Sequence, residues 1–383
     1  MKKLLLLIIT LVGTMQMVPA QAANDLTMTG LASYEELRRP YYIGALYMAN
    51  PSNNAEEILS SVGERRMEMK VTARSWSPRR FSMQWTQAMI LNVDPGLLER
   101  HDDAFVQFNN LPKQSFKQGD KIVIDSNAKG QVTISVNGTE IVEIARPGFF
   151  EVLLSTWIGR KPPSSDFKAA MLGSIDGALL AEYEAMNPSE ERVEQVAAWM
   201  DEGEGKAAKE VAVTREAPAA TAAAATAATA TAVAAATADT ADTAAATSAA
   251  EAKPVQVAMA KPQPAPVIEE EEEELFIDPE IYRIQQATLL KLYKSSVIKR
   301  TLRQVQYPKN AVRRNQQGKV LLDITVDRTG QILSIFAKEE ARYNSLNDAA
   351  VAAVNAAGDF PAVPAALEGQ KVTVTVPVTF KLN

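Results

Sequence analysis

Residues 130–144 read GQVTISVNGTEIVEI, and this stretch decides how the surrounding chain is interpreted. Apolar and polar side chains alternate on both sides of Asn137-Gly138, a pair that favours a tight turn between antiparallel strands. The stretch is therefore predicted to be a β-hairpin. Similar alternating or apolar segments occur at residues 41–49, 66–73 and 121–127, each bounded by turn-forming residues, which indicates further strands.

Helical periodicity appears between these strands. It is found at residues 81–93 and 149–159, and at 164–175, where Ser164 and Ser165 can cap the first turn. A fourth amphipathic segment begins at Pro188-Ser189 and has acidic residues in its first turn. Residues 25–203 are therefore predicted to form one α+β domain.

The C-terminal part shows a second, smaller pattern. A helical segment at residues 288–308 ends at a proline, and two strands at 318–339 flank an Arg328-Thr329-Gly330 turn. A helix at 344–358 and a last alternating strand at 370–382 complete it. Residues 281–383 are predicted to form a small three-stranded αββαβ domain, with more basic than acidic side chains.

Residues 204–280 have a composition unlike either domain. They include a long Ala/Thr tract, then a Pro-containing segment, and then a run of glutamates at 269–274. Such segments lack the large apolar side chains that offset the entropy of ordering, so a long disordered linker is predicted. The glutamate run is either a solvated spacer or a segment that folds back on the basic C-terminal domain, and it could mask that domain.

The first residues are those of an export signal. Lys2 and Lys3 precede a short apolar run, and Ala20 and Ala22 stand at the spacing that a signal peptidase prefers. Residues 1–22 are predicted to be a cleaved signal peptide, with Ala23 as the first mature residue. The alternative is an uncleaved membrane anchor, which needs a longer apolar run.

Composition excludes several kinds of chemistry. The chain has no cysteine and a single histidine, His101, which its acidic neighbours suggest is a solvated surface residue. No metal site, cofactor or catalytic residue is predicted. Nucleic-acid binding is also set aside, because the basic patch has no accompanying aromatic stacking platform. An acidic partner or an anionic envelope polymer suits this patch better; its members are Lys299, Arg300, Arg303, Lys309, Arg313 and Arg314.

The C-terminal hundred residues resemble the C-terminal domain of the TonB family. The resemblance is carried by YPKNA at 307–311, GKVLLDITVDRTGQI at 318–332, LNDAAVAAV at 346–354, FPAVP at 360–364 and VTVPVTFKL at 374–382. It implies a sheet of three antiparallel strands with two helices on one face and no catalytic centre.

The TonB resemblance also implies a mode of binding. Members of this family pair with an extended peptide of an outer-membrane protein along the edge of the sheet, and some relatives contact peptidoglycan or dimerise. The partner-binding edge is predicted along Lys371, Val372, Thr373, Val374, Thr375 and Val376, because Pro377 limits pairing beyond it. The alternative is that the edge is covered. Energy transduction requires a membrane-embedded N-terminus, which the predicted cleavage would remove.

The N-terminal domain resembles the bacterial chalcone isomerase-like family. The matching stretches are YYIGALYMA at 41–49, RRFSMQWTQAMILN at 79–92, FKQGDKIVID at 116–125, the hairpin, and FFEVLLSTWIGRKPPSSDFKAAMLG at 149–173. The family fold is an open-faced antiparallel β-sandwich, with helices on one face of a large sheet and a ligand cleft between them.

Catalytic members of that family use an Arg, a Thr and a Tyr around this cleft. The resemblance places Tyr42 near the Thr position and Thr29 near the Arg position, and the Tyr has no counterpart. Non-enzymatic members hold fatty acids through an Arg, for which Arg38 or Arg39 could substitute, although two arginines before a proline usually face solvent. Trp76, Trp85 and Trp157 either line the cleft or form core.

These observations predict a non-enzymatic interaction or scaffold protein of the Gram-negative periplasm. Its TonB-like domain would bind an envelope protein, such as an outer-membrane receptor, or peptidoglycan. Its chalcone isomerase-like domain would bind a protein, a fatty acid or another apolar ligand. The alternatives are a TonB-type energy transducer for outer-membrane transport and an isomerase or lyase that uses the N-terminal cleft.

Overall fold

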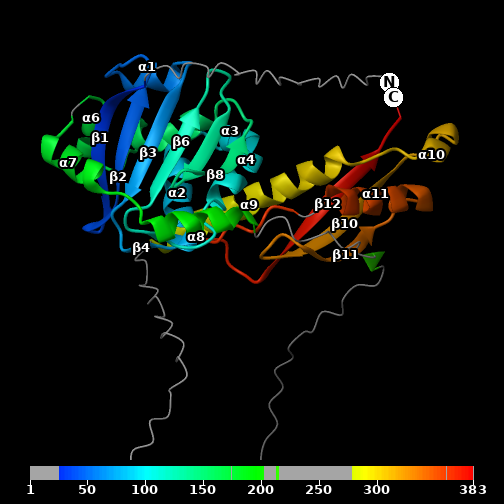
Figure 1. Ribbon diagram of the computed structural model, residues 1–383. Coiled ribbons are helices and arrows are strands. Elements are labelled where there is room, and N and C mark those ends of the chain that lie inside the picture. Colours follow the sequence, from blue (N-terminus) through cyan, green and yellow to red (C-terminus); the bar gives the residue numbers. More distant parts are fainter. Residues whose placement is uncertain (1–25, 174, 202–212, 215–277, 359, 383) are drawn as a thin grey trace, which may run out of the picture. The chain divides into compact units, whose positions relative to one another are not determined.

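The computed structural model describes residues 26–173, 175–201, 213–214, 278–358 and 360–382 (Figure 1). All of these residues belong to one compact unit of the chain. The predicted signal peptide, the glutamate run and most of the predicted linker lie outside the described residues.

The N-terminal domain is built around an antiparallel sheet with strand order β1-β2-β3-β6-β7-β8. Its strands are β1 Thr27–Glu36, β2 Arg39–Met48, β3 Arg65–Val71, β6 Lys121–Ser126, β7 Val132–Val136 and β8 Thr139–Ile144. A small separate pair is formed by β4 Ser75–Trp76 and β5 Phe116–Lys117. The predicted hairpin is confirmed as β7 and β8, and Asn137 and Gly138 both adopt positive φ in its turn, at 51° and 87°.

Helices follow the positions that periodicity predicted, with four additions. The helices of this domain are α1 Ala55–Ser60, α2 Pro78–Asn92, α3 Pro95–Arg100, α4 Asp102–Asn109, α5 Phe149–Ile158, α6 Ser165–Met171, α7 Gly177–Ala185 and α8 Glu190–Asp201. Ser164 caps α6 by accepting a hydrogen bond from the Phe167 amide, as predicted. The short helices α1, α3, α4 and α7 were not predicted.

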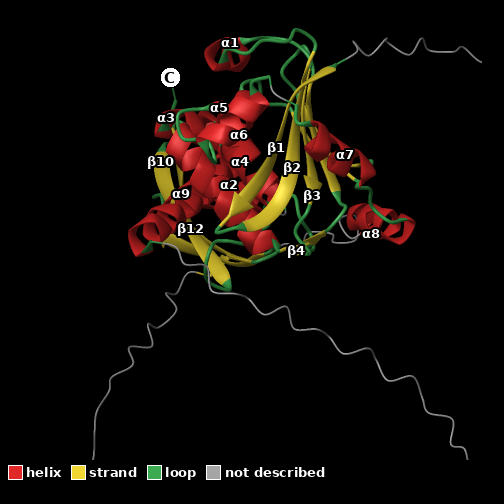
Figure 2. Ribbon diagram, turned by 90° about the vertical axis from the view of Figure 1, so that its left-hand side faces the viewer, coloured by secondary structure: helices red, strands yellow, loops and turns green. Residues whose placement is uncertain are grey.

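Helices cover both faces of the large sheet. Figure 2 shows α2, α4, α5 and α6 on one side of it and α7 and α8 on the other. Residues of β2 alternate accordingly: Gly44 faces α5, where a Cβ atom would lie only 2.9 Å from the Trp157 ring, whereas Ile43 and Ala45 pack with Tyr183 of α7. The α+β sandwich is confirmed, and α7 and α8 add a second layer of helices.

The C-terminal domain has the predicted order of helix, strand, strand, helix and strand. Its elements are α9 Pro279–Arg303, the short α10 Lys309–Arg313, β10 Gly318–Asp327, β11 Ile332–Glu339, α11 Asn344–Ala357 and β12 Lys371–Phe380. A two-residue strand, β9 Val213–Thr214, pairs in parallel with Ile335 and Phe336 of β11. The sheet therefore has the order β12-β10-β11-β9, with one strand more than predicted.

Candidate functional site

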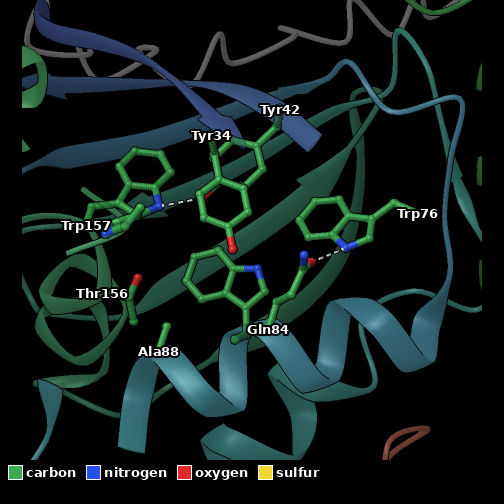
Figure 3. Close-up of a pocket in the computed structure, with 9 residues that line it drawn as sticks. Tyr34, Tyr42, Trp76, Gln84, Ala88, Thr156 and Trp157 are labelled. Atoms are coloured by element: carbon green, nitrogen blue, oxygen red, sulfur yellow. Dashed lines mark hydrogen bonds between the residues drawn. The ribbon is translucent and has the colours of Figure 1, made fainter. Parts of the chain in front are cut away.

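Two features of the structure are candidates for function. The first is an aromatic pocket between the large sheet and helices α2 and α5 (Figure 3). The second is the outer edge of β12 in the C-terminal domain.

The aromatic pocket contains residues from both the sheet and the helices that cover it. It is lined by Tyr34, Tyr42, Trp76, Gln84, Trp85, Ala88, Thr156, Trp157 and Pro163. Tyr34 of β1 pairs with Tyr42 of β2 in the strand register, and their rings stack at a centroid distance of 4.9 Å. The ring of Tyr42 also stacks between those of Trp76 and Trp157, at 5.6 Å and 6.0 Å.

Hydrogen bonds fix the polar atoms of this cluster. Trp157 Nε1 donates to the Tyr42 hydroxyl over 3.0 Å, and Trp76 Nε1 donates to Gln84 Oε1 over 2.6 Å. Gln84 Nε2 in turn donates to a Glu36 carboxylate oxygen over 2.5 Å. The indole groups are therefore both satisfied and held in one orientation.

The free volume left between these side chains is about 30 Å³. That is room for one or two water-sized groups. A drug-sized ligand typically occupies a pocket of roughly 300–1,000 Å³. The aromatic side chains thus fill most of their own cleft, so the three tryptophans are both buried core and pocket wall.

Burial raises the pKa of Tyr34 and Tyr42 above the ordinary tyrosine value. Both phenols are therefore neutral at physiological pH and can donate or accept hydrogen bonds. The lining residues include no carboxylate, histidine, lysine or arginine. The walls of this pocket supply apolar and stacking contacts rather than charge.

Of the two residues assigned to the cleft, the structure places only Tyr42 in the pocket. Thr29 lies at an irregularity of β1 between Met28 and Gly30, and its hydroxyl donates to the Leu46 carbonyl over 3.2 Å. Arg38 lies in the turn between β1 and β2 and Arg39 is the first residue of β2, and both are exposed. Neither reaches the pocket lining.

Sequence reasoning missed Tyr34 and Gln84. No sequence signal identifies Tyr34, because a register shift between Tyr34 and Glu35 brings it opposite Tyr42 instead of Tyr41. Gln84 lies on α2 one turn from Ala88, but its partner Trp76 comes from a two-residue strand that no pattern indicated.

His101 was expected at the surface, and this was wrong. It lies between α3 and α4 with only 5% of its surface exposed, and its ring packs against Phe149 at a centroid distance of 5.9 Å. Desolvation lowers its pKa below the ordinary histidine value, and Arg146 and Arg100 act in the same direction. Its Nδ1 is buried without a hydrogen-bond partner.

The second candidate, β12, is an edge strand of the C-terminal sheet. Its ten residues pair with β10 without a register shift, from Lys371 opposite Asp327 to Phe380 opposite Gly318. No described strand pairs with its other side. Val372, Val374, Val376, Val378 and Phe380 are buried, whereas Thr373, Thr375 and Thr379 are exposed.

Two observations show which amides of β12 point outward. Alternate residues of an antiparallel strand direct their N–H and C=O groups to opposite sides. The Asp327 amide donates to Gln331 on the β11 side, so the pair Asp327 and Lys371 exchanges no hydrogen bonds, and the Lys371 amide faces away from β10. Pro377, which has no N–H, lies an even number of residues from Lys371, so its backbone nitrogen is on the same outward side. The amides of Thr373 and Thr375 therefore face outward as well.

The structure separates the basic patch into two groups. Lys309, Arg313 and Arg314 are exposed on or next to α10. Lys299 and Arg303 of α9 instead form ion pairs with Asp102 and Asp103 of α4. Arg300 donates to the Ala357 carbonyl within its own domain, over 3.3 Å.

Within the described residues there is no cluster of three or more side chains suited to holding a metal ion. No helix in the described part of the chain has both the length and the apolar character that a membrane crossing requires.

Comparison with known proteins identifies both folded parts. Residues 14–173 match the chalcone isomerase-like family, and residues 303–382 match the C-terminal domain of the Gram-negative bacterial TonB protein. These matches confirm both resemblances, and the second associates the chain with the Gram-negative envelope. Among curated proteins, none matches this sequence.

One of the solved structures that the chain matches is a fatty-acid binding protein of Arabidopsis thaliana. The two are 11% identical, and the match covers 40% of this chain and 90% of the plant protein, with a TM-score of 0.33.

Proposed function

We propose that the protein is a non-enzymatic interaction protein of the Gram-negative periplasm. Its C-terminal domain binds an extended segment of an envelope protein, which adds as a further strand along β12. The observation that carries this proposal is the open outer side of β12, with the outward amides of Lys371, Thr373 and Thr375. Unpaired amides and carbonyls of an edge strand are a template for an incoming strand.

The other edge of the sheet offers less of this template. The opposite edge, β11, already pairs with β9 at Ile335 and Phe336. Pro377 interrupts the donors of β12 towards its C-terminal end, so the bound segment pairs chiefly along residues 371–376. The exposed side chains of Lys309, Arg313 and Arg314 belong to the same domain, and they favour a segment with acidic flanks.

Several features argue against an isomerase or lyase. Cyclisation of a phenolic substrate requires a group that stabilises the developing charge, and the pocket lining has no cationic side chain. Burial raises the pKa of Tyr34 and Tyr42, so both phenols keep their proton at physiological pH and cannot act as general bases. The proposal therefore assigns binding, not catalysis, to the N-terminal domain.

A second binding role for the N-terminal domain is supported by Tyr34. It is the half-buried member of the stacked cluster, and its hydroxyl points into the pocket in Figure 3. We propose that a small apolar or aromatic ligand enters when the Tyr34 ring swings out. A long fatty acid would need several neighbouring rings to move as well.

Photo-crosslinking in intact cells tests the strand-pairing proposal. A photoreactive residue is placed at Thr373 of β12 or, as a matched control, at Ser334 of β11. Both positions pair with Thr325 and so lie in one row of the sheet. The proposal expects a specific envelope protein to be captured from Thr373 and not from Ser334, and the capture to disappear when Thr375 is also replaced by proline. Equal capture from both positions would contradict it.

A further inference from the structure

Helix α9 has two faces that make different contacts. One face bonds to the C-terminal domain itself. Three residues of this face donate to backbone carbonyls: Gln286 Nε2 to Ala366 over 2.7 Å, the Tyr293 hydroxyl to Pro361 over 3.0 Å, and Arg300 Nε to Ala357 over 3.3 Å. The donors are seven residues apart, so they lie along one side of the helix.

The other face of α9 is directed at the N-terminal domain. Gln285 Nε2 donates to Gln87 Oε1 of α2 over 3.2 Å, and the Ser296 hydroxyl donates to Asp103 Oδ1 of α4 over 2.6 Å. Gln285 and Ser296 are buried at 1% and 2% exposure. Lys299 and Arg303 continue the same stripe, because spacings of three, four and seven residues share a helix face.

The surface that receives this stripe is an acidic corner where α3 meets α4, formed by Glu99, Asp102 and Asp103. Lys299 Nζ lies 2.7 Å from Asp102 Oδ2 and donates to the Glu99 carbonyl over 3.2 Å. The side chain of Asp102 has no exposed surface. Its Oδ1 accepts a hydrogen bond from the Asp103 amide over 2.8 Å, whereas its Oδ2 makes no directed hydrogen bond and is compensated by the ion pair with Lys299.

Further polar contacts surround this ion pair. Arg303 pairs with Asp103, and Lys291 pairs with Glu99. Both cations are largely exposed, so these two pairs add little energy and respond to salt. On another part of the C-terminal domain, the Ala362 carbonyl accepts a hydrogen bond from Asn110 Nδ2, which follows α4, over 2.5 Å.

Almost all of α9 lies outside the two family matches. The TonB-type match begins at residue 303, the last residue of α9, and the chalcone isomerase-like match ends at residue 173. The acidic corner lies within the latter match. The helix that joins the two domains is therefore an addition to the matched TonB-type segment.

We propose that α9 is a docking helix, and that its partner is the acidic corner of the N-terminal domain of the same chain. The contact holds the two domains together even when the segment between them is cut, and the ion pair of the partly exposed Lys299 with the buried Asp102 supplies its electrostatic specificity. The C-terminal domain thus presents β12 from a fixed position on the N-terminal domain. The basic face of α9 is used inside the molecule, which leaves the exposed cations of α10 for external partners.

Cutting the intervening segment of the full-length protein tests this proposal. A specific protease site is inserted within residues 218–277, the protein is cleaved, and the products are analysed by size-exclusion chromatography with light scattering at low salt. The docked arrangement predicts that the fragments elute together as a one-to-one complex. Replacing Lys299 and Arg303 by alanine should raise the dissociation constant of this complex about thirty-fold or more.

The matched control removes the same charge elsewhere. Lys309→Ala with Arg313→Ala takes two cations from α10 and should leave the complex intact. A second pair of variants, Glu99→Gln with Asp103→Asn, weakens the acidic corner from the other side, so that misfolding of one variant does not decide the outcome. Separation of the unmodified fragments at low salt, or equal dissociation constants for the α9 and α10 variants, would overturn the proposal.

Discussion

The indole nitrogen of Trp157 donates a hydrogen bond of 3.0 Å to the hydroxyl of Tyr42, and this bond connects α5 to β2 across the aromatic pocket. Both residues are almost fully buried. Tyr42→Phe leaves the buried indole N–H without a partner, which should lower the free energy of unfolding by about 1–3 kcal/mol. Urea denaturation of the full-length protein measures this change.

Tyr34→Phe is the control for that substitution. It removes a hydroxyl from the ring stacked on Tyr42, but no hydrogen bond of the Tyr34 hydroxyl is found among the described residues. Its effect on unfolding should be a few tenths of a kcal/mol. Equal losses in the two variants would contradict the role assigned to the bond between Trp157 and Tyr42.

Tyr34→Ala should open the pocket. The truncation removes one wall of a cavity whose free volume is about 30 Å³, so an apolar fluorescent dye gains room. We expect tighter binding of the dye to this variant than to the unmodified protein, measured by fluorescence titration. Ala88→Leu, which narrows the same pocket from α2, should abolish binding in both backgrounds. If the dye binds equally well to the unmodified protein, to Tyr34→Ala and to Ala88→Leu, it binds outside this pocket.

The ion pair of Arg192 and Asp120 should be essential for attaching α8. The guanidinium donates to both carboxylate oxygens of Asp120, which has no exposed surface. Arg192→Leu leaves that carboxylate buried and unpaired, at a cost of roughly 3–5 kcal/mol. Adding Asp120→Asn should recover part of the loss, because the unpaired charge is gone. The thermal stability of the single and double variants decides this; a double variant less stable than Arg192→Leu would contradict it.

His101 should make stability depend on pH. Its folded-state pKa lies below the unfolded value near 6.5, so the unfolded chain binds the proton more readily. Stability is therefore complete above about pH 6.5 and is lost as the pH falls through that value towards the folded-state pKa. In His101→Gln the difference in unfolding free energy between pH 7.5 and 5.5 should shrink. An unchanged difference would assign the pH dependence to other groups.

The sequence was sufficient for elements whose signal is local. The β7–β8 hairpin follows from Asn137-Gly138, and α6 follows from the Ser164 cap, because both depend on neighbouring residues alone. The stacked pair of Tyr34 and Tyr42 was missed because it depends on the register of β1 against β2.

Long-range partners were the hardest part to predict. Periodicity shows that α9 has buried positions, but it does not show that Ser296 and Lys299 meet α4 while Tyr293 meets its own domain. In the same way, composition suggested that Lys299 and Arg303 were a free basic surface. Their acidic partners lie about two hundred residues earlier in the chain, where no local pattern points to them.

The central claim is that an extended segment pairs with the outer edge of β12, and calorimetric titration of two variants at one position tests it most directly. The probe is an acidic-flanked peptide selected on the unmodified protein from a random library. Thr375→Pro removes an outward amide, whereas Thr375→Val keeps that amide and loses only the side-chain hydrogen bond to Asp323. The account predicts at least tenfold weaker binding for Thr375→Pro and nearly unchanged binding for Thr375→Val. Unchanged binding by a folded Thr375→Pro protein would contradict it.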